Sequence, residues 1–303
     1  MTSLRARLII GLLRVSGQKR FYADVATMHR KLPAHQRASK ARPPRWLRRN
    51  YRIEQTEVHG FPCYTLRPPG PLRQDLHLLH LHGGAYVEQI ERHHWNFAGH
   101  VIDRLGCAVT LPIYPLAPRF DHTKTVPMVE AVYERVLDGC PPEHRIISGD
   151  SAGAGLALAV AQRLRADRRP QPARLVLFSP WLDVTMEDPV SALIDERDPM
   201  LGVPGLREAG RMYADQADPH DPEISPINAD FTGLGPFSVF IGTRDLLLPQ
   251  ARWLKREVEE AGKALDYVEY PGMFHNWMMQ PIPEGREALD QLERILRRPP
   301  PRR

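Results

Sequence analysis

Residues 144–164, HRIISGDSAGAGLALAVAQRL, place a short apolar run, a glycine-flanked serine and a long apolar segment in direct succession. The run 144–148 predicts a strand, and the segment from Ala152 predicts a helix that is apolar nearly all round and therefore buried. A tight strand-to-helix turn at GDSAG (149–153) would lift the oxygen of Ser151 above the strand ends, because flanking glycines let the backbones approach. Ser151 is thus a candidate nucleophile; a plain βα turn is the alternative.

Strand-like and helix-like stretches alternate on both sides of this turn. Strands are expected at 51–58, 61–66, 76–81, 107–114, 144–148, 174–178, 237–242 and 265–270. Helices are expected at 126–136, 152–164, around Trp253 and Val258, and at 286–296. The first two strands predict a hairpin closed at Gly60. Strands separated by helices predict an α/β fold with a mostly parallel sheet covered on both faces.

Two segments do not fit the alternation. Residues 1–50 precede the sheet, and residues 184–225 interrupt it with prolines, aspartates and weak helical patterns. Both are expected to form a helical cap over the strand ends, around a core of residues 51–183 and 226–298. The proline-rich tail 299–303 is expected to be disordered.

Two further polar residues follow predicted strands. Asp245 comes shortly after the strand at 237–242, and His275 follows the strand at 265–270. The carboxyl ends of parallel strands lie at one edge of the sheet, where ligands collect, so both side chains are expected near Ser151. His275 would act as the base that takes the Ser151 proton, and Asp245 would hold the imidazole. Because His275 must be neutral, kcat/KM is expected to rise with pH around 6.5.

A glycine pair follows the strand at 76–81, in HGGAY (82–86). Backbone N–H groups aimed at a developing oxyanion are each worth about 3–4 kcal/mol. The N–H groups of Gly83, Gly84 and Ala152 are expected to form this oxyanion hole.

With these motifs, the chain resembles the hormone-sensitive lipase-like esterases of the α/β-hydrolase fold. The resemblance extends from Leu76 to Met279 and includes YPLAP (114–118), SPWLD (179–183) and DPEISP (221–226). It implies hydrolysis of short- to medium-chain carboxylic esters through an acyl-enzyme, a helical cap, and no metal or cofactor. Lactones present the same carbonyl. The family usually has a third glycine where this chain has Ala85, which narrows the space and penalises a positive φ.

Two alternatives remain open. A deacetylase or amidase acting on a natural product would use the same residues. A catalytically silent binding module, like the plant gibberellin receptor, would have lost the histidine, and the presence of His275 disfavours it. Eight apolar residues near the predicted cap and histidine loop would either line an acyl or alcohol pocket or pack in the core: Met200, Leu201, Met212, Tyr213, Met273, Phe274, Trp277 and Met278.

The charge of the chain is unevenly distributed. Residues 1–50 have a net charge of +12, and the remaining 253 residues have −7. Zinc-ligand spacing, an aromatic stacking motif and a nucleic-acid fold signature are all missing from the basic segment 1–50, so no nucleic-acid partner is expected. The apolar run 8–13 is too short for a signal peptide or for a spanning helix of about 20 residues. An amphipathic helix packed on the protein is expected, without stable membrane insertion; attachment to a membrane surface is the alternative.

The cysteines indicate a reducing compartment. Cys63, Cys107 and Cys140 form no C-x-x-C pair, and three is an odd number, which argues against a disulfide framework. A cytoplasmic enzyme with a small-molecule ester as its partner is expected, and a homodimer is an open alternative.

Overall fold

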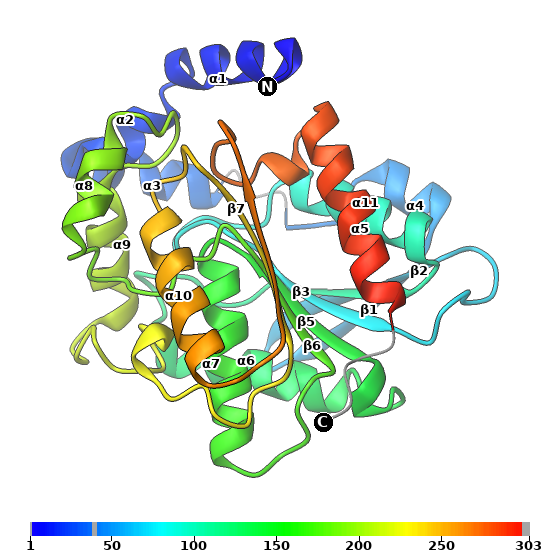
Figure 1. Ribbon diagram of the computed structural model, residues 1–303. Helices are drawn as coiled ribbons and strands as arrows, with labels where there is room; N and C mark the ends of the chain where they lie inside the picture. The colour runs from blue at the N-terminus through cyan, green and yellow to red at the C-terminus, as the bar shows by residue number, and fades with distance from the viewer. Residues whose placement is uncertain (1, 38–40, 299–303) are drawn as a thin grey trace.

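The computed structural model describes residues 2–37 and 41–298, built around one eight-stranded sheet (Figure 1). The strand order is β1-β2-β4-β3-β5-β6-β7-β8. The bounds are β1 (Arg52–Val58), β2 (Phe61–Arg67), β3 (His77–Leu81), β4 (Ala108–Pro112), β5 (Arg145–Asp150), β6 (Arg174–Phe178), β7 (Phe237–Gly242) and β8 (Leu265–Tyr270). Strand β2 pairs antiparallel with both of its neighbours, β1 and β4, and every other neighbouring pair, from β4–β3 to β7–β8, is parallel. The predicted α/β fold with a mostly parallel sheet is therefore confirmed.

The predicted hairpin closes at a two-residue turn. His59 and Gly60 have φ values of 50° and 82°, and two positive φ angles in succession match the twist of the flanking strands. The central strands β3, β5, β6 and β7 are buried along their whole length, which explains their continuous apolar sequences.

Helices cover both faces of the sheet. On one face lie α6 (His122–Arg135), α7 (Ala152–Ala166) and α10 (Leu248–Glu260), and on the other lie α5 (Arg92–Leu105) and α11 (Pro283–Arg297). Figure 1 shows α7 and α10 on the left of the sheet and α5 and α11 on its right. Three short 3₁₀ helices complete the core: η1 (Pro142–His144), η2 (Pro226–Asn228) and η3 (Trp277–Met279).

Helix α5 was not predicted from the sequence. Its buried residues include Trp95, Ala98, Ile102 and Leu105, at the spacing of one helix face. Polar residues, including the three histidines of this helix, obscure the pattern in a simple search for apolar periodicity.

The N-terminal segment packs on the insertion after β6. The N-terminal helices are α1 (Leu4–Val15), α2 (Gln18–Ala23) and α3 (Val25–Arg37), and the insertion contains α8 (Pro189–Asp195) and α9 (Val203–Ala214). Both α2 and α3 contact α9, and Lys19 bonds to the Asp195 side chain and the Leu201 carbonyl. The close approach needs a glycine, because a Cβ on Gly205 would lie 2.4 Å from the Tyr22 carbonyl oxygen.

One helix of the predicted cap segment 1–50 lies elsewhere. In α4 (Arg45–Asn50), Leu47 belongs to the same apolar cluster as the buried residues of α5 and α11, and the Trp46 ring lies beside Gly99 of α5. The part of the N-terminal segment that meets the insertion therefore ends with α3. The predicted disordered tail 299–303 lies outside the described residues.

The three cysteines are buried free thiols, and burial raises the pKa of Cys63 and Cys107 to about 12. Within residues 2–37 and 41–298, each helix is too short or too polar to cross a membrane.

Candidate active site

Ser151 lies on a strained turn between β5 and α7. Its φ of 54° and ψ of −123° are unusual for a residue with a side chain, and its N–H donates to the Phe178 carbonyl at 2.9 Å. Both flanking glycines are required by contact. A Cβ on Gly149 would lie 2.1 Å from the Gly153 oxygen, and one on Gly153 would lie 2.0 Å from the Leu81 oxygen. The sequence GDSAG thus forms the predicted strand–turn–helix, with Ser151 at the N-terminus of a long helix.

His275 and Asp245 are brought together as predicted. The Nδ1 of His275 lies 3.0 Å from Asp245 Oδ2, and both residues are buried. The other carboxylate oxygen, Oδ1, accepts the N–H of Leu247 at 3.0 Å, so the carboxylate is fixed in orientation. His275 and Ser151 line the same cavity. No hydrogen bond between the two side chains is found in the described chain, and such bonds often tighten only when substrate binds.

A second buried carboxylate, Asp198, lies beside this pair and was not predicted from the sequence as a site residue. Its Oδ1 accepts the N–H groups of Met200 and Leu201 at 2.8 and 2.9 Å, and its Oδ2 accepts the N–H of Leu246 at 2.8 Å. Asp198 therefore ties the insertion to the residue that follows Asp245. Burial, followed by the charge of Asp245, raises the pKa of Asp198 to about 6.

These carboxylates also act on the histidine. Burial alone would lower the pKa of His275, but the nearby carboxylates of Asp245, Asp198 and Asp150 together raise it above its usual value. The imidazolium that forms when His275 accepts a proton is thus stabilised by three buried carboxylates.

The glycine loop after β3 has three consecutive residues with positive φ. The values are 124° at Gly84, 51° at Ala85 and 61° at Tyr86. The N–H of Gly83 donates to Asp150 Oδ1 at 3.0 Å, so this predicted oxyanion donor is already occupied. For the N–H groups of Gly84, Ala85 and Ala152, no acceptor is found among the described residues.

Comparisons with known proteins identify the family of the chain. A family profile described as the alpha/beta hydrolase fold matches residues 78–279. The chain belongs to the α/β-hydrolase family. It is 36% identical over 231 residues to an acetyl-hydrolase of Streptomyces hygroscopicus, covering 75% of this chain and 77% of that one. It is 32% identical over 216 residues to an esterase of Acinetobacter venetianus, covering 70% and 71%.

Solved structures of esterases are similar to this α/β-hydrolase over nearly its whole length. A crystal structure of an esterase from the bacterial hormone-sensitive lipase family superposes with a TM-score of 0.84 at 28% identity, covering 99% of each chain. A crystal structure of the esterase EstE5 soaked with p-nitrophenyl butyrate also gives 0.84 at 28% identity, covering 97% of this chain and 98% of that one. The predicted fold, family and enzyme class, a serine hydrolase of the esterase type, are thereby confirmed.

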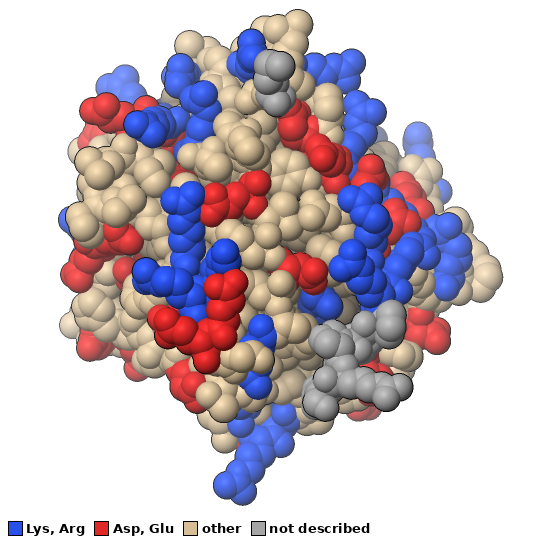
Figure 2. Space-filling model, viewed as in Figure 1, with Lys and Arg blue, Asp and Glu red and all other residues tan. Residues whose placement is uncertain are grey.

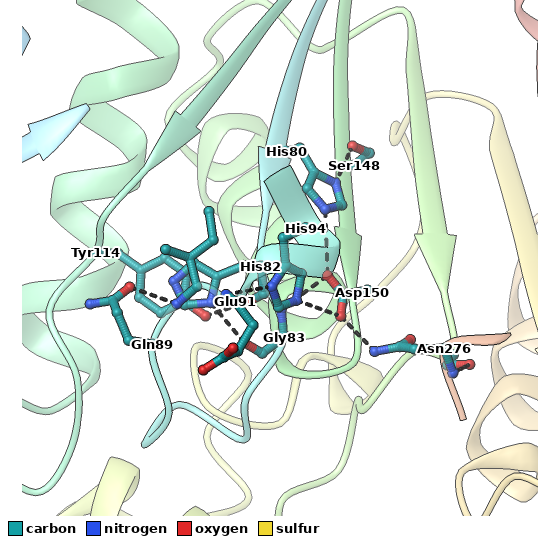
Figure 3. Close-up of polar contacts among 12 residues, drawn as sticks. His80, His82, Gly83, Gln89, Glu91, His94, Tyr114, Ser148, Asp150 and Asn276 are labelled. Carbon is teal, nitrogen blue, oxygen red and sulfur yellow. Dashed lines mark hydrogen bonds and ion pairs between the residues drawn. The ribbon is translucent and has the colours of Figure 1, made fainter. Parts of the chain in front are cut away.

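Asp150 of this α/β-hydrolase joins the loops that contain Gly83, Ser151 and Asn276 (Figure 3). Its carboxylate accepts the Gly83 N–H from the glycine loop and, at 2.6 Å, the Nδ2 of Asn276 from the histidine loop. The Nε2 atoms of His80 and His94 each lie 3.4 Å from the same carboxylate. Burial would raise the pKa of Asp150, but these two imidazoles hold it well below its usual range. Asp150 remains charged and fixes the loops on either side of Ser151.

His82 has a structural place in the same loop. Its ring stacks on Tyr114 with centroids 4.2 Å apart, and its Nδ1 bonds to the Gly83 carbonyl at 2.7 Å. Burial, followed by the nearby His94, lowers the pKa of His82 to about 3. His82 is therefore neutral and shapes the turn in which Gly83 and Gly84 lie.

Ser151 opens into a cavity of about 490 Å³ between the sheet edge and the N-terminal helices. Its wall includes Leu13, Gln18, Tyr22, His35, Gly83, Gly84, Ala85, Glu88, Gln89, Glu91, His93, His94, Met200, Leu201, Leu206, Asn276 and Gln280. Of the eight apolar residues considered for a pocket, only Met200 and Leu201 are among these; the other six are buried in the core. For those six residues, core packing is therefore the alternative that the structure favours.

Glu88 links the cavity wall to the N-terminal helices. Its Oε2 accepts the hydroxyl of Tyr22 at 2.6 Å, and its Oε1 lies 2.9 Å from Nδ1 of His35.

In the part of the chain that the structure describes, no cluster of three or more His, Cys, Asp and Glu side chains is arranged to hold a metal ion.

Proposed function

We propose that this α/β-hydrolase is a serine carboxylesterase that cleaves small carboxylic esters, with Ser151 as nucleophile, His275 as base and Asp245 as the residue that orients His275. One observation supports this most: a strained serine turn opens into the cavity that is also lined by a histidine bound to a buried carboxylate. No separate chemistry is needed from a metal or cofactor.

The steps follow from the hydrogen bonds. Because Nδ1 of His275 is bound to Asp245, the neutral imidazole has its lone pair on Nε2, which takes the Ser151 proton as Oγ attacks the ester carbonyl. The tetrahedral intermediate collapses when Nε2–H protonates the leaving alcohol, and an acyl-Ser151 ester remains. A water molecule repeats both transfers, releasing the acid and restoring Ser151.

The oxyanion hole proposed here differs by one residue from the sequence-based expectation. Gly84, Ala85 and Ala152 are the proposed donors, because their N–H groups lack acceptors among the described residues whereas Gly83 is bound to Asp150. Gly83 then serves to anchor the loop. The alanine that replaces the usual third glycine keeps its N–H at a φ of 51°.

Short acyl chains are the proposed substrates. The curated relatives include an acetyl-hydrolase, and the EstE5 crystal was soaked with a butyrate ester. The cavity has many polar side chains, among them Gln18, Gln89 and Gln280, which favours a polar alcohol group over a long hydrocarbon tail. A lactone presents the same carbonyl and belongs to the same proposal.

The N-terminal helices and the insertion are proposed to act together as the cap of this site. Both segments contribute to the cavity wall. The residues are Leu13 of α1, Gln18 and Tyr22 of α2, Met200 just before α9, and Leu206 in α9. Substrate size would then be selected by the contact between these two segments.

The test is hydrolysis of p-nitrophenyl acetate, butyrate and octanoate by the parent and by Ser151→Ala. The variant is expected to lose at least about 10⁴-fold in kcat, because the nucleophile is missing. Ser191→Ala is a matched control: Ser191 is buried in α8, away from the cavity wall, and its Oγ has no partner among the described residues. Equal rates for the parent and Ser151→Ala would reject the proposal.

A further inference from the structure

The first helix exposes a continuous apolar stripe. Leu4, Leu8, Leu12 and Val15 have exposed fractions of 72%, 60%, 65% and 81%. At about 100° per residue, spacings of four, four and three residues put these side chains on one side of α1. Single exposed leucines are common on protein surfaces, but an aligned row on one short helix is not. The sequence expectation that α1 packs its apolar residues on the protein therefore holds only for its other side, where Ala6 and Ile10 are buried.

Arginines border the stripe on both sides. Arg5 lies beside Leu12 around the helix, and Arg7 and Arg14 lie beyond Leu4 on the opposite border. Residues 4–23 contain five Lys or Arg and no acid, and no ion pair of Arg5, Arg7 or Arg14 is found in the described chain. In Figure 2, blue side chains stand on either side of a tan ridge at the top of the view, where Figure 1 places α1.

The helix is held in place at its start and lies over the cavity. Ser3 donates from N–H and Oγ to the Glu284 carboxylate at 2.6 and 2.9 Å, which fixes α1 to the beginning of α11. Leu13, on the side away from the stripe, lines the cavity that contains Ser151. One side of α1 thus forms the cavity wall while the other side faces outward.

We propose that α1 binds the surface of an anionic lipid bilayer, with Leu4, Leu8, Leu12 and Val15 in the acyl boundary and Arg5, Arg7 and Arg14 at the headgroup phosphates. An apolar stripe bordered by basic residues is the pattern of a helix that lies in the membrane interface. The two attractions, apolar burial and headgroup charge, act together, and each alone gives weak attachment. The cavity mouth would then lie close to the lipid surface.

A second copy of the chain fits this stripe less well. Symmetric pairing of α1 with itself would bring its arginines close to those of the other copy, with no acid on either helix to offset the repulsion. An anionic surface removes that repulsion and covers the same leucines.

The experiment is co-flotation of the full chain with phosphatidylcholine vesicles and with vesicles containing phosphatidylglycerol. We expect binding to the anionic vesicles, weaker binding to the neutral ones, and loss of binding at high salt because the arginine contacts are screened. Leu8→Glu is expected to weaken binding about tenfold, because a carboxylate beside anionic headgroups replaces a leucine that the bilayer would bury. Leu8→Glu/Leu12→Glu is expected to abolish it.

Leu72→Glu is the control, since Leu72 is an exposed leucine outside α1 and should leave vesicle binding unchanged. Hydrolysis of a soluble ester without vesicles should be the same in the parent and in both α1 variants, which reports that the fold is intact. Flotation requires no catalysis, so its outcome is independent of the proposed esterase activity. The proposal would be overturned if the parent did not bind vesicles, or if the two α1 variants bound anionic vesicles as strongly as the parent. It would also be overturned if the parent were a dimer that Leu8→Glu converts to a monomer.

Discussion

Two buried carboxylates, Asp245 and Asp198, lie beside one histidine, and their hydrogen bonds differ. Asp245 contacts the His275 ring. Both carboxylate oxygens of Asp198 instead accept backbone N–H groups, from Met200, Leu201 and Leu246. Asp245→Asn should therefore lower kcat by about 10⁴-fold, because the amide favours the wrong imidazole tautomer. Asp198→Asn should lower kcat by less than about tenfold, and comparable losses in both variants, measured with p-nitrophenyl acetate, would contradict these roles.

Asp198 also gives a prediction for the pH profile. Its carboxylate helps to raise the pKa of His275, so removing that charge lowers the pKa and leaves more neutral imidazole at acid pH. The acid limb of kcat/KM should lie above about 6.5 in the parent, and it should move to lower pH in Asp198→Asn. A limb that stays in place would show that Asp198 acts only as a structural anchor, and a limb that moves to higher pH would contradict the charge effect on His275. Ser191→Ala should leave the profile unchanged.

The positions of site residues could be predicted from the sequence where chain order and strand ends decide them. Ser151, Asp245 and His275 each follow a strand of the parallel sheet, so the topology alone puts them at one edge. Asp198 lies in the insertion, and only the packed structure brings it to Leu246. Which N–H of the glycine loop is free depends on the Asp150–Gly83 bond, which the sequence does not reveal.

Among the elements, the turn from β5 into α7 limits what the sequence can be. A methyl on Gly153 would lie 2.0 Å from the backbone oxygen of Leu81, an atom that cannot move without disturbing β3. Gly153→Ala should therefore destabilise the protein by about 3 kcal/mol. Gly11→Ala is the matched control, because a Cβ there meets nothing within 4 Å. It should stabilise the exposed helix α1 by up to about 1 kcal/mol.

Urea denaturation followed by circular dichroism measures both glycine variants. Equal midpoints for the two would contradict the contact argument.

The elements themselves were largely predictable: the strands lie within two residues of their expected bounds because apolar runs end at glycine, proline or polar clusters. The helix α5 was not found because histidines and polar residues dilute its apolar face. The packing of α4 on α5 rather than on the insertion depends on Trp46, whose ring lies beside Gly99 of a helix that was not predicted from the sequence.

For the whole molecule, the sheet edge, the glycine loop and the N-terminal helices enclose one cavity from distant parts of the chain. Asp150 bonds to the loops of Gly83 and Asn276, and Glu88 bonds to Tyr22 and His35 of the N-terminal helices. The strained Ser151 is thus held in place by groups that are themselves fixed. This arrangement supports one central claim, that Ser151 is the residue acylated during turnover.

Covalent labelling tests that claim most directly. The parent would be treated with diethyl p-nitrophenyl phosphate, which phosphorylates activated serines, and then analysed by intact mass and peptide mapping. We predict one adduct per chain on the peptide that contains Ser151, no adduct in Ser151→Ala, and much slower labelling in His275→Ala. An adduct on another residue, or undiminished ester hydrolysis by a parent whose Ser151 is fully labelled, would contradict the account.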